Sequence, residues 1–379
     1  MARPVDLSGI PLVDGHCHPL LRDPLAVSSD TFLDFFTEGR PGTMREHIPH
    51  TGYAQRAVHA LARKLGVEPS VDAVLEARRR AGSEAGRAHV RQARVAALLV
   101  DTGYPPEAMP LDEMRKILDC DIHEVVRIEA CAERLLARRL SYQAFVEAFR
   151  RTLHEAVPRC VAFKTIVAYR SGLDVRTWTE DEAAASYARA LAATPAGGRA
   201  RLIEKPLLDR LVEITLEIAS RTGRPVQIHA GFGDPDIDLL RANPLLLRSV
   251  VEDPRWKTTR LVLLHMAYPY AREAAFMTAV WPQVHLDLSL ALPFLGPGAL
   301  FPLLEILSLA PYSKLMYGSD VSGLPELFAL SAEWARATLG EALGWLVERD
   351  GLDEQAAAAI GRAILSDNAR ALYGLRREP

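Results

Sequence analysis

The feature that most limits the possible folds is an alternation of short apolar segments with longer helical ones. Eight β-rich apolar runs occur along the chain, and sequence with helical character follows each of them. They cover residues 10–16, 95–100, 124–128, 160–168, 225–229, 261–265, 284–288 and 315–318. Alternating strands and helices favour a parallel sheet with right-handed crossovers, and eight such units are the number in a closed (β/α)₈ barrel. The sequence therefore predicts an α/β fold, a TIM barrel.

Several of the intervening helices carry start and stop signals. Thr179 and Glu182 have the spacing of a capping box, which predicts a helix running to about residue 193. Pro206 marks the start of another helix, with helically spaced apolar residues that continue to Gly223. Residues 333–347 and 353–365 are predicted as the closing helices.

One connection is too long for an ordinary loop between a strand and a helix. Nearly 80 residues separate the first two predicted strands, and residues 30–36, 53–65 and 71–80 within them have helical character. We expect a single domain, 1–379, with a helical insertion over about 28–92 at the mouth of the barrel. Active sites of this fold lie at that mouth, so the insertion is predicted to act as a lid and substrate selector. The run of three arginines at 78–80 is interpreted as a solvated helix face.

Composition excludes several classes of partner. The 379 residues are 49% hydrophobic and 25% charged, with a formal net charge of −3, so no basic field exists to attract nucleic acid or an anionic membrane. No unbroken apolar run approaches the length of a membrane span, and the first nine residues lack the apolar segment of a secretory signal. Four scattered cysteines without a C-x-x-C pair are typical of reduced thiols. We therefore expect a cytoplasmic protein that acts on a small molecule.

The segment Asp14-Gly15-His16-Cys17-His18 ends the first predicted strand. Side chains two residues apart on a strand point to the same face, so His16 and His18 converge while Cys17 points away. Two convergent imidazoles can bind a first-row divalent metal such as Zn²⁺. Asp14 shares their face and is interpreted as a structural hydrogen-bonding partner.

Further candidate ligands end later strands. His229 ends the fifth predicted strand, His265 the sixth, and Asp320 follows the eighth. Alone, each has a simpler interpretation as a satisfied core histidine or a turn residue. The strand ends of a closed barrel converge on one pocket, however, and three imidazoles with a carboxylate there would form a metal site with an open coordination position.

These residues resemble the metal-dependent amidohydrolase superfamily in their identity and order. The ending at 365–373 resembles the Asn-Ala-x-x-Leu-Phe/Tyr ending of the amidohydrolase-2 branch. Residues 163–173 are similar to the amidohydrolase domain that some organisms fuse to a glutamine-synthetase-like domain. A short tail follows residue 373, so no fused synthetase domain is expected here.

The resemblance implies a role for each candidate. His16, His18 and His229 would ligate a divalent metal, with Asp320 as a fourth ligand that also handles the proton of water. His265 would lie beside the metal and polarise the substrate or shuttle a proton. The resemblance implies Zn²⁺ first and Mn²⁺ as the alternative, with one ion per chain.

Lys164 on the fourth strand and Arg170 after it leave several interpretations open. A carboxylated Lys164 would bridge two metal ions, as in some members of the superfamily. Alternatively, Lys164 and Arg170 contact a substrate carboxylate, which Arg170 can hold in a bidentate manner. Lys164 can also be a plain buried lysine paired with an acid, and Arg170 a surface ion-pair residue.

The leading hypothesis is a metal-dependent amidohydrolase that activates water to cleave a non-peptide C–N bond. Its substrate is expected to be a small polar amide that bears a carboxylate. A metal-dependent nonoxidative decarboxylase or a sugar-acid isomerase is the alternative on the same barrel, and a degenerate barrel that only binds is the non-enzymatic one. A homodimer is expected only from the general frequency of dimers.

Overall fold

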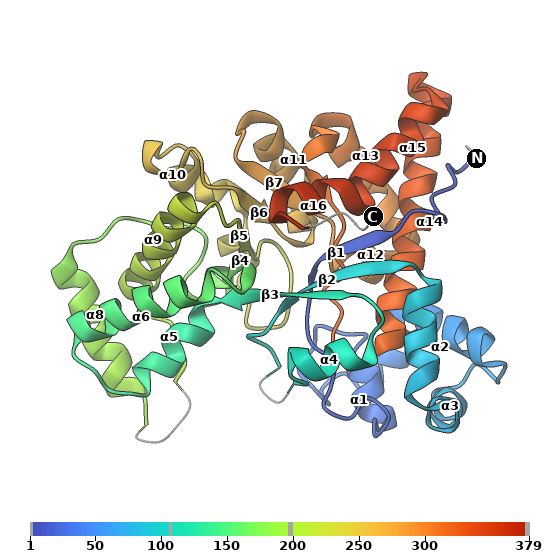
Figure 1. The fold of residues 1–379 in the computed structure, drawn as a ribbon, viewed down its shortest axis with the longest axis horizontal. Helices are drawn as coiled ribbons and strands as arrows, with labels where there is room; N and C mark the ends of the chain where they lie inside the picture. The colour runs from blue at the N-terminus through green and yellow to red at the C-terminus, as the bar shows by residue number, and fades with distance from the viewer. Residues whose placement is uncertain (1–2, 106–107, 196–199, 376–379) are drawn as a thin grey trace.

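The computed structural model describes residues 3–105, 108–195 and 200–375, and its centre is a barrel of eight parallel strands (Figure 1). The strands pair in chain order from β1 to β8, so the (β/α)₈ prediction is confirmed. Their bounds are β1 Leu12–Cys17, β2 Val95–Asp101, β3 Asp121–Arg127, β4 Cys160–Thr165, β5 Val226–Ile228, β6 Leu261–Leu263, β7 Val284–Asp287 and β8 Leu315–Met316. Each overlaps a run predicted from the sequence.

The barrel closes where β1 meets β8. The N–H of Gly15 donates to the carbonyl of Tyr317 at 2.9 Å, and the N–H groups of Ser319 and Asp320 donate to the carbonyl of His16. A Cβ on Gly15 would lie 2.9 Å from the Tyr317 oxygen, so the seam requires glycine there. This seam brings the histidine motif of β1 next to Asp320.

The interior of the barrel explains which side chains reach the site. Small and branched apolar residues fill its lower part, and α16 (Asn368–Tyr373) packs Leu372 and Tyr373 against them. On β2, β3 and β4 the inward-facing residues Leu99, Val125 and Ala162 belong to this apolar layer. Because side chains alternate along a strand, the next inward positions are the polar residues 101, 127 and 164. The strands therefore carry an apolar layer below a polar one.

The remaining helices surround the barrel. Their bounds are α4 Leu111–Ile117, α5 Ile128–Leu136, α6 Tyr142–Ala156, α7 Val167–Arg170, α8 Glu180–Ala193, α9 Lys205–Thr222, α10 Arg248–Val251, α11 Ala271–Val280, α12 Ala291–Leu295, α13 Leu300–Leu309, α14 Pro325–Asp350 and α15 Glu354–Arg362. Thr179 and Glu182 form the predicted capping box of α8. Gly223 caps α9 in the left-handed conformation, as its position in the sequence indicated.

Three helices of the predicted insertion lie between β1 and β2 and pack beside α14 (Figure 1). They are α1 Ser29–Asp34, α2 Gly52–Leu65 and α3 Val71–Gln92. The interpretation of 78–80 as a solvated face is wrong for Arg78, which is 1% exposed and pairs with Glu326 of α14. The helix turns Arg78 inward, whereas Arg79 and Arg80 are exposed.

One helical segment, Ala291–Leu309, is long and apolar enough to cross a membrane by length and composition, contrary to the expectation from the sequence. It comprises α12, a 3₁₀ turn and α13, and Gly296 interrupts it with a φ of 56°. The segment follows β7 and packs against α11 and α14. In this fold it belongs to the outer helical layer of the barrel.

Candidate functional site

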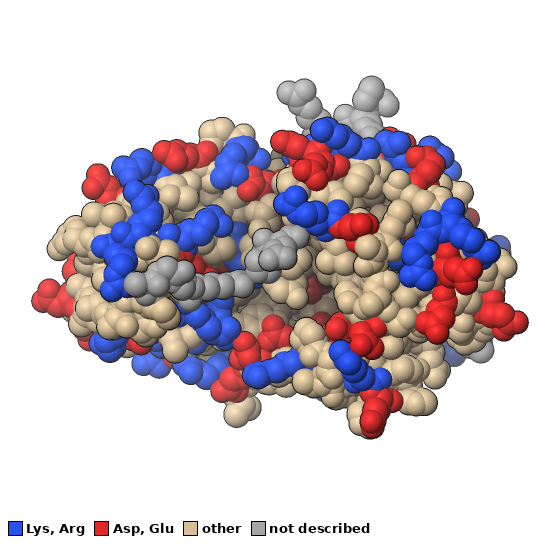
Figure 2. Space-filling view, turned by 90° about the horizontal axis from the view of Figure 1, so that it is seen from below, with Lys and Arg blue, Asp and Glu red and all other residues tan. Residues whose placement is uncertain are grey.

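A cavity of about 1250 Å³ opens at the carboxyl ends of the strands. Its walls combine strand-end residues such as His18, Lys164 and Asp320 with Glu38 and Tyr53 from the insertion. Figure 2 shows a hollow in the middle of the face seen from below, with acidic side chains along one edge. The site therefore lies where ligands bind in this fold, and the insertion forms part of its wall.

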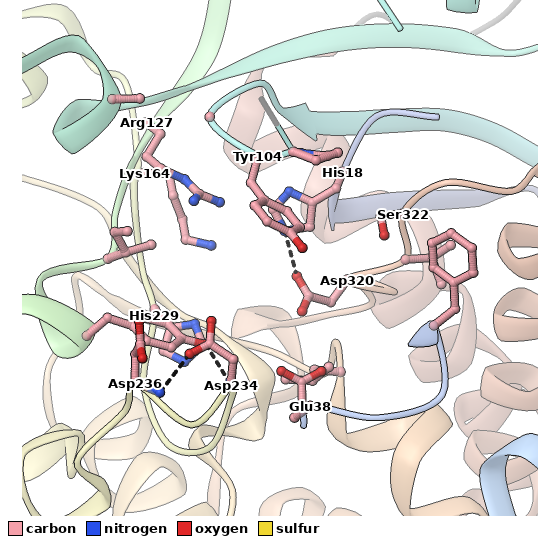
Figure 3. Close-up of a pocket in the computed structure, with 18 of the residues that line it drawn as sticks. His18, Glu38, Tyr104, Arg127, Lys164, His229, Asp234, Asp236, Asp320 and Ser322 are labelled. Atoms are coloured by element: carbon pink, nitrogen blue, oxygen red, sulfur yellow. Dashed lines mark hydrogen bonds and ion pairs between the residues drawn. The ribbon is translucent and has the colours of Figure 1, made fainter. Parts of the chain in front are cut away.

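His16, His18 and Asp320 meet at the bottom of this cavity. Oδ1 of Asp320 lies 3.0 Å from Nε2 of His16 and 3.2 Å from Nε2 of His18 (Figure 3). This oxygen is buried, yet it accepts no well-oriented hydrogen bond from any group in the described part of the chain. Two ring nitrogens and a carboxylate oxygen thus converge without satisfying one another.

The partners of Nδ1 in His16 and His18 explain why Nε2 of each ring faces Asp320. Nδ1 of His16 donates to Oε1 of Gln227 at 2.9 Å, because the amide nitrogen of Gln227 already donates to the Gly15 carbonyl and the Tyr373 hydroxyl. Nδ1 of His18 faces the carbonyl of Asp101 at 3.3 Å. These contacts place the proton of each ring on Nδ1 and a lone pair on Nε2, the form that ligates metals.

Burial favours the neutral form of three of these imidazoles, whereas neighbouring histidines keep Asp320 ionised. It lowers the pKa of His16 to about 4 and also moves the pKa values of His229 and His265 well below their ordinary range. Burial alone would raise the pKa of Asp320, but His265, His16 and His18 outweigh it and hold that pKa well below its usual value. Neutral imidazoles and an ionised carboxylate are the states that bind a divalent cation.

His265 and His229 lie side by side, with Nε2 of His265 2.9 Å from Nδ1 of His229. Nδ1 of His265 faces the hydroxyl of Ser289 at 2.9 Å, and that hydroxyl donates to Asp287. His265 therefore carries its proton on Nδ1 and offers a lone pair at Nε2. Nε2 of His229 instead faces the carbonyl of Phe232 at 3.1 Å.

Two groups of donor atoms in the described residues are compact enough to hold a metal ion. One consists of His16, His265 and Asp320, and the other of His16, His18 and Asp101. We call these five residues the donor cluster. It fits a divalent cation, because Nε2 of His16 and Nε2 of His18 converge on the unsatisfied Oδ1 of Asp320 and His16 belongs to both groups. His229 belongs to neither group, so its role as a ligand stays a prediction.

The backbone at two of these positions is unusual for residues other than glycine. His265 and Asp320 have φ angles of 66° and 61°. Such left-handed conformations cost free energy and persist where the surrounding structure enforces them, often at functional sites. Asp14 accepts hydrogen bonds from the N–H groups of Ser319 and His16, which confirms its expected structural role.

Lys164 lies inside this region and not at its edge. Its Nζ is 2.9 Å from Nε2 of His16 and 3.7 Å from Oδ2 of Asp101, and the side chain is buried. Burial lowers the pKa of Lys164. The position suits a metal bridge, a substrate contact and a buried ion pair, so these interpretations stay open.

Arg127, at the end of β3, is the register partner of Lys164 on β4, and the sequence analysis missed it. Its Nε and Nη2 donate to Oδ2 of Asp101 at 2.9 and 2.6 Å. Arg170 also lines the cavity, but its guanidinium pairs with Glu133 at 3.3 Å. The role of Arg170 in substrate binding stays a prediction.

Asp101 and Arg127 had a signal in the sequence, because Asp101 directly follows the predicted run 95–100 and Arg127 is the last residue but one of the run 124–128. Glu38 and Tyr104 had none, since they lie in loops. Tyr104 packs edge-on against His18 with ring centroids 5.7 Å apart. The position of a loop residue depends on the tertiary structure, so these two residues could be assigned to the site only from the structure of the cavity.

Comparison with known proteins gives a family and relatives. The family model described as Amidohydrolase matches residues 147–375, more than half of the chain. Protein fluG of Emericella nidulans is 29% identical over 97% of this chain and 46% of its own length. The chain thus spans about half the length of that curated relative.

Solved structures share the fold. A candidate metal-dependent hydrolase from Lactobacillus casei superposes with a TM-score of 0.88 at 27% identity, covering 98% of both chains. A uronate isomerase from Thermotoga maritima has a TM-score of 0.68 at 13% identity, covering 97% of this chain and 95% of its own. At that identity, the second likeness concerns the fold alone.

Proposed function

The chain belongs to the amidohydrolase family, and on that premise we propose that it is a metal-dependent hydrolase that cleaves the C–N bond of a small, carboxylate-bearing amide. The observation that carries the proposal is the convergence of His16 and His18 on the unsatisfied Oδ1 of Asp320. A bound divalent cation supplies Lewis acidity that lowers the pKa of water and polarises a carbonyl. We expect Zn²⁺ or Mn²⁺ there.

The side chains have distinct parts in this reaction. His16 and His18 would hold the cation through Nε2, and Gln227 keeps His16 in the tautomer that this requires. Asp320 is ionised and accepts a proton from the attacking water. His265, held by Ser289, lies in the same group as Asp320, so it would take that proton from Asp320 on Nε2 and pass it to the leaving nitrogen.

The basic side of the cavity supports a carboxylate-bearing substrate. Arg127 and Lys164 lie beside the donor cluster and present cationic groups to the cavity (Figure 3). A guanidinium and an ammonium group are favourable partners for a carboxylate. This arrangement would orient an amide with its carbonyl toward the donor cluster.

The test is a paired assay on protein purified without chelators and loaded with Zn²⁺ or Mn²⁺. Amine or ammonia release from small carboxylate-bearing amides is measured beside CO₂ release from aromatic acids and isomerisation of uronates. We expect amine release that His16→Asn abolishes and that His59→Asn, an exposed histidine on α2, leaves intact. CO₂ release or isomerisation without amine release would replace hydrolysis with the alternative reaction, and inactivity in every assay would favour a binding protein.

A further inference from the structure

The cavity has basic side chains on one side and carboxyl groups on the other. Arg127 and Lys164 project from the ends of β3 and β4, and Glu38 and Asp234 lie across the cavity from them (Figure 3). Asp320 lies between the two pairs in this view. We call Arg127 with Lys164 the basic side and Glu38 with Asp234 the acidic side. Any ligand that reaches the donor cluster therefore meets both.

The acidic side lacks a cationic partner within the described part of the chain. Glu38, in the insertion loop after α1, forms no hydrogen bond or ion pair there. Among the described residues, the carboxylate of Asp234 accepts one hydrogen bond, from the N–H of Asp236 at 2.9 Å, and forms no ion pair. The neighbouring arginines Arg40 and Arg201 both pair with Asp236 instead, at 3.3 and 2.8 Å. Within the described ranges, Glu38 and Asp234 thus face the cavity without an ion pair of their own, and Arg201 and Arg170 act on Asp234 only through their charge.

These unpaired carboxylates destabilise one another. Burial, together with the negative charges of Asp320 and Asp234, raises the pKa of Glu38 to about 8. Burial also raises the pKa of Asp234. A cationic group bound between Glu38 and Asp234 would relieve this repulsion, because an opposite charge favours the ionised form.

The basic side has the complementary property. Arg127 uses Nε and Nη2 to hold Asp101, and its Nη1 has no hydrogen-bond partner among the described residues. Lys164 is only 1% exposed as a residue and contacts His16 and Asp101. An anionic group in the cavity can therefore approach Arg127 without displacing an existing partner.

We propose that the ligand of this cavity is a short dipolar molecule, with a carboxylate toward Arg127 and Lys164 and an ammonium group held by Glu38 and Asp234. A ligand with only a carboxylate would leave Glu38 and Asp234 without a cationic partner. A ligand with only an ammonium group would leave Nη1 of Arg127 without a hydrogen-bond partner. The inference rests on the proposed function in taking the donor cluster as the reaction centre between the two charges. Glu38 is then a specificity-determining residue supplied by the insertion.

The experiment is a binding measurement that needs no turnover. Titration calorimetry on the metal-loaded protein compares the ω-amino acids from 3-aminopropanoate to 6-aminohexanoate with the alkanoate of the same length. We expect at least one ω-amino acid to bind about tenfold more tightly than its alkanoate, as for a charge-assisted hydrogen bond in a partly buried site. Glu38→Gln should remove that preference.

Glu46→Gln is the matched control, because Glu46 is exposed in the same segment and does not line the cavity. The proposal is overturned if no ω-amino acid binds better than its alkanoate, or if the Glu38 and Glu46 variants change the preference equally. Failure of hydrolysis would leave the binding preference intact, whereas loss of the preference would leave hydrolysis untouched. The two proposals therefore fail in separate experiments.

Discussion

The residues of the donor cluster lie at the ends of barrel strands, whereas those of the acidic side of the cavity lie in loops. In the donor cluster, His16 is fully buried and has a partner on each ring nitrogen. On the acidic side, Glu38 is half-buried without a partner and Asp234 is exposed. The barrel strands hold the side chains of the donor cluster in position through many hydrogen bonds. The loops supply Glu38 and Asp234, which make few contacts and, in our proposal, select the ligand.

The largest effect is expected in the donor cluster. Asp320→Asn removes the charged metal ligand that also accepts the proton from water. We therefore expect kcat to fall by about 10²–10⁴-fold with the fold retained. The rate is measured on metal-loaded protein, and circular dichroism checks the fold. Asp350→Asn, at the exposed end of α14, is the control. Equal rates in the two variants would remove Asp320 from the mechanism.

The insertion that carries Glu38 should depend on one buried ion pair. Arg78→Ala leaves Glu326 buried without its partner, so we expect the free energy of unfolding to fall by about 3–5 kcal/mol. Arg79→Ala, at the exposed neighbouring position, should change it by less than about 0.5 kcal/mol. Urea unfolding of both variants measures the difference. Similar losses would mean that the pair does not anchor the insertion.

A smaller effect is expected behind the donor cluster. Gln227→Leu removes the acceptor that fixes the His16 tautomer, so metal affinity should fall about 10–100-fold. Competition with a chelator measures it. Gln283→Leu is the control, because Gln283 is also buried but donates to the Val251 carbonyl. If both variants bind metal equally, orientation by Gln227 is unimportant.

The smallest effect is a pH dependence on the acidic side. The pKa of Glu38 is raised to about 8, so this carboxyl is protonated below that pH and ionised above it. Because Asp320 stays ionised and 4-aminobutanoate stays dipolar between pH 6 and 9, its affinity should rise several-fold with pH as Glu38 ionises. Calorimetry across this range gives the profile. A Glu38→Gln variant with the same slope would contradict the assignment.

The sequence predicted the barrel and most of the donor cluster because both follow from local patterns. Strand periodicity placed His16 and His18 on one face, and Asp320 follows a short apolar strand. The acidic side could not be predicted, since Glu38 and Asp234 are nearly 200 residues apart and meet only through tertiary structure. Arg78 was misassigned for a related reason: its burial depends on Glu326, a partner that no local pattern reveals.

The most direct test of the account is the metal content per chain, measured by elemental analysis of protein purified without chelators or a metal-binding tag. We predict one divalent ion per chain, lost in His16→Asn and retained in His59→Asn. Two ions per chain would indicate that Lys164 is carboxylated and bridges two metal ions in the same centre. Absence of bound metal, even after addition of Zn²⁺ or Mn²⁺, would contradict the claim that the donor cluster is a metal site.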